Sequence, residues 1–195
     1  MGRPYDTSGG PRHFAPVLAP AKKDPLTLSF ANLVEAHLLR ALRTAHDVPF
    51  REVRKAIAYA ERDLKIDRLL LREDLRTEGG QVFLDHFGQL VNLSASGHLA
   101  IRRLLQDHLK RIDWDGKNSP VRLYPFITSG TDSQSRSILI DPGILFGRPV
   151  VQRAFVSTRT LVERLDAGES LDDVAADYEL TPELVEYAAL YERAA

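Results

Sequence analysis

The chain has 195 residues, of which 44% are hydrophobic, a length and composition that suit one domain or two small ones with a real core. It contains no cysteine, which excludes disulfides, thiol catalysis and cysteine-ligated zinc and fits a reducing compartment. Neither an apolar signal segment nor a run long enough to span a bilayer is present, so we expect a cytoplasmic protein without membrane contact.

Formal charge is distributed unevenly, although the net charge of the chain is only −1. Residues 1–60 carry nine Lys or Arg against five Asp or Glu, whereas residues 126–195 carry six against twelve. Ends of opposite sign favour different partners, or contact with each other.

The first third of the chain predicts a hairpin followed by two helices. Residues 3–20 contain two short extended stretches around Gly9-Gly10, a dipeptide suited to a positive-φ turn, and four prolines that exclude a helix. Apolar residues at helical spacing predict one helix within residues 29–46, with Ser29 as the N-cap, and another within residues 49–65.

The middle of the chain predicts a small antiparallel β element and a further helix. Apolar and polar residues alternate over residues 71–94 around Gly79-Gly80, which predicts a hairpin and a third strand at about residues 89–93. Helical spacing returns over residues 96–112, and residues 114–126 predict a turn that leads into a strand.

The last third predicts short strands followed by three short helices. Residues 138–156 form extended pieces, and the helix starts are indicated by Ser157, by a capping box from Ser170 to Asp173, and by Thr181 before a proline. Each helix is too short to be stable alone, so we expect all three to pack together.

These elements predict an α+β protein that is mainly helical. Residues 1–127 are expected to form a partial winged-helix-like domain of mixed α+β structure. Residues 128–137, ten residues without one aliphatic side chain, are the linker candidate. Residues 138–195 are expected to form a C-terminal trihelical, helix-turn-helix-like domain preceded by short strands.

No motif indicates catalysis or a cofactor. The chain has neither a phosphate-binding P-loop nor the nucleophile elbow of a serine hydrolase. Residues 113–119 resemble the start of a calcium loop, but Tyr124 stands where a bidentate Glu is required, which favours a solvated turn. His37 and His108 lie on apolar helix faces, and no two histidines have the spacing of a helical metal pair. We therefore expect no enzyme, no metal or other cofactor, and no small-molecule substrate.

Basic residues in the N-terminal part are candidates for contact with duplex DNA, as at an operator. One group follows the outer face of the second predicted helix: Arg51, Arg54, Lys55 and Arg62. A second group lies on the N-terminal hairpin: Arg3, Tyr5, Arg12 and His13. Such a hairpin beside helices is how a winged helix contacts phosphates or the minor groove, although an ordinary solvated face explains the helical group equally well.

The C-terminal helix-turn-helix outline carries the wrong charge for reading DNA. The helix that would enter the groove presents Glu183, Glu186 and Glu192 against a single Arg193. Duplex DNA carries one negative charge per ~1.7 Å of its axis and would repel this surface. The apolar residues of the motif exceed what one buried face needs, which favours self-association, and the candidates for a homodimer contact are Leu184, Tyr187 and Tyr191.

The stretch from Ile138 to Tyr191 resembles the bacterial domain of unknown function 433. The resemblance rests on five short motifs: Asp141-Pro142, residues 147–151 (GRPVV), residues 167–170 (AGES), Asp177-Tyr178 and Leu180-Thr181. The sequence departs from the family at residues 153–155, where Arg-Ala-Phe stands in place of the usual glycine-threonine.

Upstream segments, among them GRPY at residues 2–5 and VRLYPF at residues 121–126, resemble the longer members of this family. Those members couple a MerR-like winged helix-turn-helix to the C-terminal domain and are antitoxins of the VapB type. The resemblance implies a repressor of its own operon that masks a PIN-domain ribonuclease toxin. In these members a helix-turn-helix precedes GRPY, and the present sequence would lack its first two helices. Either the true start of the protein lies upstream of Met1, or the protein contacts phosphates without much sequence readout.

Two functions from different classes follow from the sequence. The first is a dimeric, antitoxin-like DNA-binding regulator that neutralises a PIN-domain toxin, whose acidic metal site an arginine could neutralise. The arginines in turn or linker segments are the candidates for that contact: Arg136, Arg148 and Arg153. The second is a protein-interaction and dimerisation module that does not bind DNA.

Overall fold

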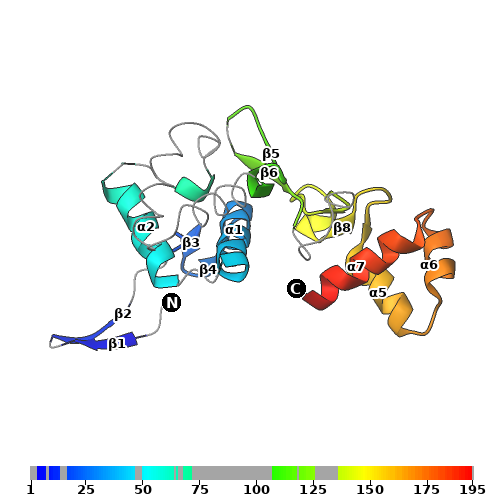
Figure 1. Ribbon diagram of the computed structural model, residues 1–195, viewed down its shortest axis with the longest axis horizontal. Helices are drawn as coiled ribbons and strands as arrows, with labels where there is room; N and C mark the ends of the chain where they lie inside the picture. Colours follow the sequence, from blue (N-terminus) through cyan, green and yellow to red (C-terminus); the bar gives the residue numbers. More distant parts are fainter. Residues whose placement is uncertain are drawn as a thin grey trace. The chain divides into compact units, whose positions relative to one another are not determined.

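The computed structural model describes residues 4–7, 9–13, 17–46, 50–63, 65, 68–71, 107–117, 119–125 and 136–194 (Figure 1). The chain divides into two compact units, residues 1–107 and residues 108–195. Helices and small antiparallel sheets occur in both units, so the fold is α+β.

In its described residues the N-terminal unit contains two separate hairpins, two helices and a short 3-10 turn. The elements in chain order are β1 (Pro4–Thr7), β2 (Gly10–His13), β3 (Lys22–Lys23), β4 (Leu26–Thr27), α1 (Phe30–His46), α2 (Phe50–Arg62) and η1 (Leu69–Leu71). The predicted hairpin is confirmed: β1 pairs with β2, and Gly10 has the positive φ of 100° that the turn requires. A winged-helix arrangement of the hairpin and the helices stays a prediction.

Helix α1 starts with the predicted cap and continues into a buried polar network. The Ser29 Oγ accepts a hydrogen bond from the Asn32 N–H at 3.2 Å, and the Asn32 side chain accepts one in return from the Ser29 N–H at 3.0 Å. The Asn32 side-chain amide also donates to the carboxylate of Glu35, a residue that is only 4% exposed. The Arg68 guanidinium donates two hydrogen bonds to the same carboxylate, at 3.0 and 2.9 Å. Pairing satisfies a charge that would be unfavourable if it were buried alone.

Much of the predicted middle region lies outside the described residues. This applies to the hairpin with its third strand over residues 71–94 beyond Leu71, and to residues 96–106 of the next helix. Residues 107–109 are helical, but the prediction of a helix to residue 112 is wrong, because Ile112 begins a strand. The Arg111 carbonyl accepts a hydrogen bond from the Tyr124 N–H at 2.8 Å, which turns the chain into a β ladder instead.

The described part of the C-terminal unit contains a hairpin, a three-stranded sheet and three helices. Strands β5 (Ile112–Trp114) and β6 (Pro120–Leu123) form the hairpin, and the antiparallel sheet has the order β7 (Ile138–Leu139), β8 (Val150–Val151) and β9 (Val156–Ser157). A β-bridge between Leu123 and Ile140 joins the hairpin to the sheet. The hairpin therefore groups with the C-terminal unit, and most of the expected linker, residues 128–135, lies outside the described residues. The domain boundaries at residues 127 and 138 stay a prediction.

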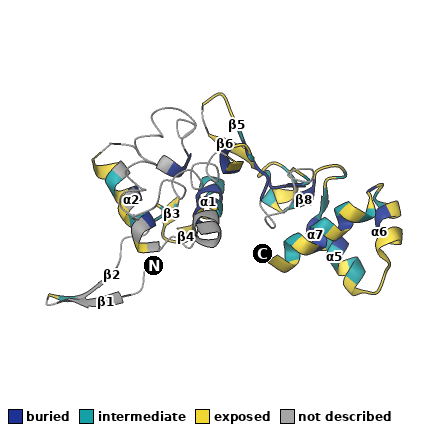
Figure 2. Cartoon of the chain, in the orientation of Figure 1, coloured by how far each residue is buried: buried dark blue, intermediate teal, exposed yellow. Residues whose placement is uncertain are grey.

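The three predicted C-terminal helices are confirmed as α5 (Thr158–Asp166), α6 (Leu171–Asp177) and α7 (Pro182–Ala194). Ser157 and Ser170 cap α5 and α6 by accepting hydrogen bonds from backbone N–H groups three residues later. Helix α7 packs against both other helices, and Figure 2 shows buried residues along their shared sides. The core between them and the sheet consists of Ile138, Val151, Leu161, Val174, Ala175, Leu180, Val185 and Ala188.

Candidate functional site

The basic group on α2 lies opposite the buried side of that helix. Val53 and Ile57 are buried, whereas Arg51, Lys55 and Arg62 are exposed and Arg54 is half-buried. The Arg62 guanidinium donates to the neighbouring Asp63 carboxylate at 3.0 Å, and this hydrogen bond is the first cause of its raised pKa. Arg62 is therefore partly neutralised within the chain.

The β1–β2 hairpin places two candidates for DNA contact directly opposite each other. Tyr5 on β1 and Arg12 on β2 are cross-strand partners, and His13 is the partner of Pro4. Arg3 lies outside the described residues. The structure thus groups three of the four hairpin candidates on one two-stranded ribbon.

Arg136, one of the three candidates for toxin contact, is held by residues of the β5–β6 hairpin. Its guanidinium lies over the Tyr124 ring, 3.9 Å from the centroid, and donates to Asp113, which also accepts from the Tyr124 hydroxyl at 3.1 Å. Partial burial opposes the charge of Arg136, but the hydrogen bonds with Tyr124 and Asp113 outweigh it and raise the pKa of the guanidinium. These contacts give Arg136 a structural role in the described part of the chain.

Arg148 and Arg153 are exposed, and neither guanidinium has a side-chain partner among the described residues. They flank the two ends of β8. Arg153 shares an open hollow of about 390 Å³ with Arg136 and Leu184. Arg148 borders a second hollow, of about 450 Å³, whose lining also includes Arg159, Glu163, Tyr191 and Glu192.

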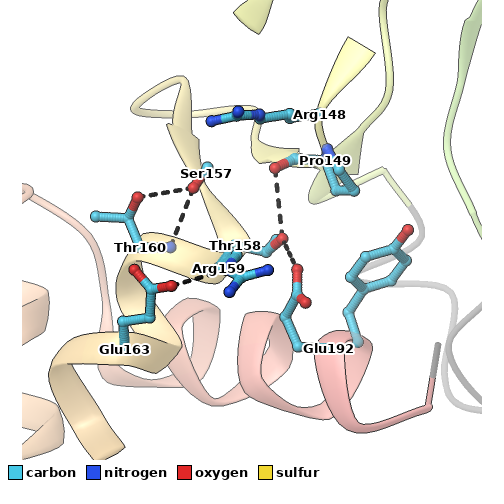
Figure 3. Close-up of a pocket in the computed structure, with 9 residues that line it drawn as sticks. Arg148, Pro149, Ser157, Thr158, Arg159, Thr160, Glu163 and Glu192 are labelled. Atoms are coloured by element: carbon cyan, nitrogen blue, oxygen red, sulfur yellow. Dashed lines mark hydrogen bonds and ion pairs between the residues drawn. The ribbon is translucent and has the colours of Figure 1, made fainter. Parts of the chain in front are cut away.

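Figure 3 shows how the charges in the second hollow are arranged. Arg159 donates to Glu163 at 2.7 Å, and the buried Thr158 hydroxyl donates to Glu192. Both carboxylates are thus occupied, and the Arg148 guanidinium lies apart from them. Arg148 is the cation of this hollow that remains available to a partner.

The outer side of α6 and α7 is acidic, and Arg164 pairs with two of the carboxylates at or near this surface. Its exposed carboxylates are Asp172, Asp173, Asp177, Glu179, Glu183 and Glu186. Arg164 on α5 donates to Glu169 and, at 2.6 Å, to Asp177, and its guanidinium lies 5.4 Å from the Tyr178 ring centroid. These hydrogen bonds raise the pKa of Arg164 and lower that of Glu169. Most of the surface remains anionic, as the sequence predicts.

The three candidates for dimerisation contact lie at the edge of the helical core. Leu184, Tyr187 and Tyr191 are half-buried and pack against the core cluster, so each presents only part of its side chain outward. Burial raises the pKa of Tyr187. Leu184 borders the hollow of Arg153, and Tyr191 borders that of Arg148. An interface here would use the edges of these side chains.

The described part of the chain shows neither a metal site nor a membrane-spanning helix. No group of three or more His, Asp or Glu side chains there is placed to hold a metal ion. No helix in the same residues has the length and apolarity to cross a membrane. His37 is half-buried and His108 is fully buried, as their apolar helix positions predict.

Sequence reasoning missed an exposed aromatic residue, Phe146, in the connection between β7 and β8. Its side chain is 99% exposed and it stands in the short 3-10 turn η4 (Leu145–Gly147). The only signal in the sequence is the run Ile144-Leu145-Phe146 directly before Gly147 and far from any helical repeat. Such a run is equally typical of a buried strand, which is why the pattern did not reveal it.

Comparisons with known proteins agree with the C-terminal resemblance and extend it. A family model described as "Protein of unknown function (DUF433)" matches residues 138–191. The chain is 25% identical over 171 residues to "Putative antitoxin VapB45" of Mycobacterium tuberculosis, a match that covers 80% of this chain and 67% of that protein. The crystal structure of Rv2018 from Mycobacterium tuberculosis has a similar fold, with a TM-score of 0.61 and 22% identity over 83% of this chain and 78% of that chain. The chain is thus similar to an antitoxin over most of its length and carries a DUF433-like segment from β7 to α7.

Proposed function

We propose that this protein is an antitoxin-like regulator of a type II toxin-antitoxin pair. Its C-terminal unit captures a PIN-domain ribonuclease, its N-terminal unit contacts operator DNA, and the protein acts as a homodimer. The observation that carries the proposal is the similarity to a protein named as an antitoxin, because that similarity spans 80% of the chain and so includes both units.

Capture of the toxin is supported by the two arginines that flank β8. A PIN-domain ribonuclease holds metal in an acidic cluster, and the planar guanidinium fork matches carboxylates. Arg148 and Arg153 are exposed, and in the described residues no carboxylate of the chain neutralises them. Arg136 contributes less to this contact, because Asp113 and Tyr124 already hold its guanidinium.

Contact with DNA is supported by the exposed cations on α2 and by the β1–β2 ribbon. Phosphate contacts need cations on a surface that the duplex can reach, and Arg51 and Lys55 satisfy this requirement. The helix-turn-helix outline of α6 and α7 does not, since its exposed side is acidic. We therefore assign DNA contact to the N-terminal unit alone.

The direct test is co-expression of the full chain with the tagged PIN-domain protein encoded next to its gene. We expect a complex that survives purification and suppresses the ribonuclease activity. Reversing both arginines, Arg148→Glu with Arg153→Glu, is expected to weaken the complex at least tenfold, whereas Arg193→Glu, an exposed arginine on α7, changes affinity less than twofold. The proposal fails if the wild-type chain does not bind that protein, or if the neighbouring gene encodes no nuclease.

The second candidate function is a protein-interaction and dimerisation module without DNA binding. The acidic exposed side of α6 and α7 favours it, because a polypeptide partner tolerates carboxylates that duplex DNA repels. Fluorescence anisotropy with duplex DNA from the region upstream of the gene separates the two functions. Binding that weakens steeply with added salt supports the regulator, and absence of binding at 50 mM salt supports the module.

A further inference from the structure

The turn between β7 and β8 exposes an aromatic side chain that contributes nothing to the core. Phe146 is 99% exposed and Leu145 is 45% exposed, whereas the preceding Ile144 packs against the cluster of Tyr124, Leu139 and Val150. The chain therefore anchors one apolar residue of this run and turns the next two outward. We refer to residues 144–147 as the Phe146 turn.

The backbone of the Phe146 turn adopts a conformation that its residues do not favour. Leu145 and Phe146 have φ angles of 44° and 58°, in the left-handed region, and Gly147 follows with 78°. Side chains with a Cβ clash with the backbone there, and consecutive left-handed residues other than glycine are uncommon. No packing of the Phe146 ring within the chain compensates for this strain, because the ring is fully exposed. Residues held in this way concentrate at sites that bind ligands or partners.

Hydrogen bonds fix the turn in place. The Asp141 carboxylate accepts from the Gly143 N–H and from the Arg122 guanidinium, both at 2.8 Å. Within the turn, the Gly147 N–H donates to the Ile144 carbonyl at 3.0 Å. The Phe146 ring is thus presented by a hydrogen-bonded turn, and such a support lowers the entropy lost when the ring binds a partner.

The charge next to the Phe146 turn is positive. Arg148 is exposed and has no side-chain partner in the described residues, while Asp141, the carboxylate that precedes the turn, is paired with Arg122. An exposed aromatic ring two residues from an available guanidinium matches an apolar pocket with carboxylates on its rim. Neither water nor a cationic partner complements both the apolar Phe146 ring and the positive charge of Arg148.

We propose that Phe146, presented by its left-handed turn and flanked by Arg148, inserts into an apolar pocket rimmed by carboxylates on the protein partner of this chain. The inference rests on the proposed function, in which that partner is the PIN-domain toxin, and it names the residue that anchors the contact. Leu145 covers the rim of the pocket, and Arg148 pairs with a carboxylate there.

The test compares two phenylalanines that both have a positive φ. Phe155, in the turn between β8 and β9, has a φ of 51° and is 52% exposed. Asn tolerates the left-handed region well, so Phe146→Asn and Phe155→Asn each remove a ring without disturbing their turns. The affinity of full-length variants for the PIN-domain protein encoded next to the gene is measured by titration calorimetry, with circular dichroism melting as the folding control.

We expect Phe146→Asn to weaken binding at least tenfold and to leave the melting temperature unchanged or raised, while Phe155→Asn alters affinity less than twofold. Equal losses for both variants, or no loss for Phe146→Asn, overturn the inference while the proposed function stands. A lower melting temperature of Phe146→Asn also overturns it, because the ring would then support the fold. If Phe146→Asn instead dissociates a dimer of the chain and leaves toxin binding intact, the occupant is a second copy and the assignment is wrong. Failure of the wild-type chain to bind contradicts the proposed function itself.

Discussion

Asp141 is a carboxylate that supports the Phe146 turn through its hydrogen bonds. Burial opposes its ionisation, but hydrogen bonds from Arg122 and the Gly143 N–H outweigh this effect and hold the pKa of Asp141 below its ordinary value of 3.8. The folded state therefore favours the charged form. The stability that this carboxylate confers is fully present above about pH 4 and is lost as the pH falls through the lower, folded-state pKa.

We predict that Asp141→Asn makes the protein less sensitive to acid. At pH 7 the variant is expected to melt about 3 °C below the wild type, because the ion pair with Arg122 is lost. The difference should shrink as the pH falls below about 4, since the wild-type carboxylate then takes up its proton. Melting curves between pH 3 and pH 7 measure this, and a difference that does not vary with pH contradicts it.

Arg164 joins the end of α5 to both ends of α6. It donates to Glu169 in the connecting turn and to Asp177 at the end of α6. Among the ion-paired arginines in the described part of the C-terminal unit, it is the least exposed. We predict that Arg164→Met, which keeps much of the aliphatic stem, lowers the melting temperature by about 4 °C. Arg159→Met is the matched control: it removes an exposed pair with Glu163 within one helix and should change the melting temperature by less than about 1 °C. Equal shifts in the two variants would contradict the role given to Arg164.

Helix caps and tight turns were predicted correctly from the sequence, because local interactions determine them. Ser29, Ser157 and Ser170 mark helix starts because each hydroxyl accepts from a backbone N–H three residues later. The Gly9-Gly10 hairpin followed from the same kind of signal, since glycine accepts the positive φ of the turn. Caps and turns of this type need no knowledge of the rest of the chain.

Elements that depend on distant partners were predicted less well. Ile112 continues the apolar spacing of a helix, yet it pairs with Leu123 in β5–β6, because a ladder eleven residues away outweighs the local pattern. The Phe146 turn was missed for a related reason: the hydrophobic pattern reports how apolar a segment is, whereas exposure here results from left-handed backbone angles. Of the candidate toxin contacts, the sequence could not distinguish Arg136 from Arg148, because the cation–π partner Tyr124 is twelve residues away from Arg136.

Helix α2 allows a test of DNA contact that spares the fold. Val53 and Ile57 carry the buried side of the helix, so reversing the exposed Arg51 and Lys55 to Glu should leave the helix content unchanged. We predict that this double variant binds its upstream duplex at least tenfold more weakly at 100 mM salt. The slope of log K against log salt should also become shallower by about 2, or 0.9 for each lost phosphate contact.

The control for this variant is Lys117→Glu, which reverses an exposed lysine in the C-terminal unit. Its affinity for the duplex and its salt slope are expected to match those of the wild type. If the α2 variant and the control behave alike, the α2 residues make no phosphate contacts, and the cationic face is an ordinary solvated one.

The two units of the molecule differ in the sign of the charge on their candidate binding surfaces. The candidates for DNA contact all belong to residues 1–107, while the acidic helices and both available arginines beside β8 belong to residues 108–195. A polyanion and a folded protein can therefore be bound through different units of one chain. Dimerisation would serve both activities, because two copies present two cationic faces to one duplex and raise their effective concentration.

Formation of the homodimer can be tested with variants of two adjacent residues on α7. Leu184, Tyr187 and Tyr191 are spaced at i, i+3 and i+7 on α7 and pack against the core cluster, whereas Leu190 is not part of that cluster and is more exposed, at 46%. We predict that Tyr191→Asp yields monomers in sedimentation velocity and also lowers the melting temperature, because the ring packs against the core as well. Leu190→Asp introduces the same charge at a site outside the proposed contact and should remain a dimer. Both samples are compared at a temperature where circular dichroism shows them fully folded, so that loss of the dimer is not loss of the fold. Dimers of the Tyr191 variant, or monomers of the Leu190 variant, would place the association surface elsewhere.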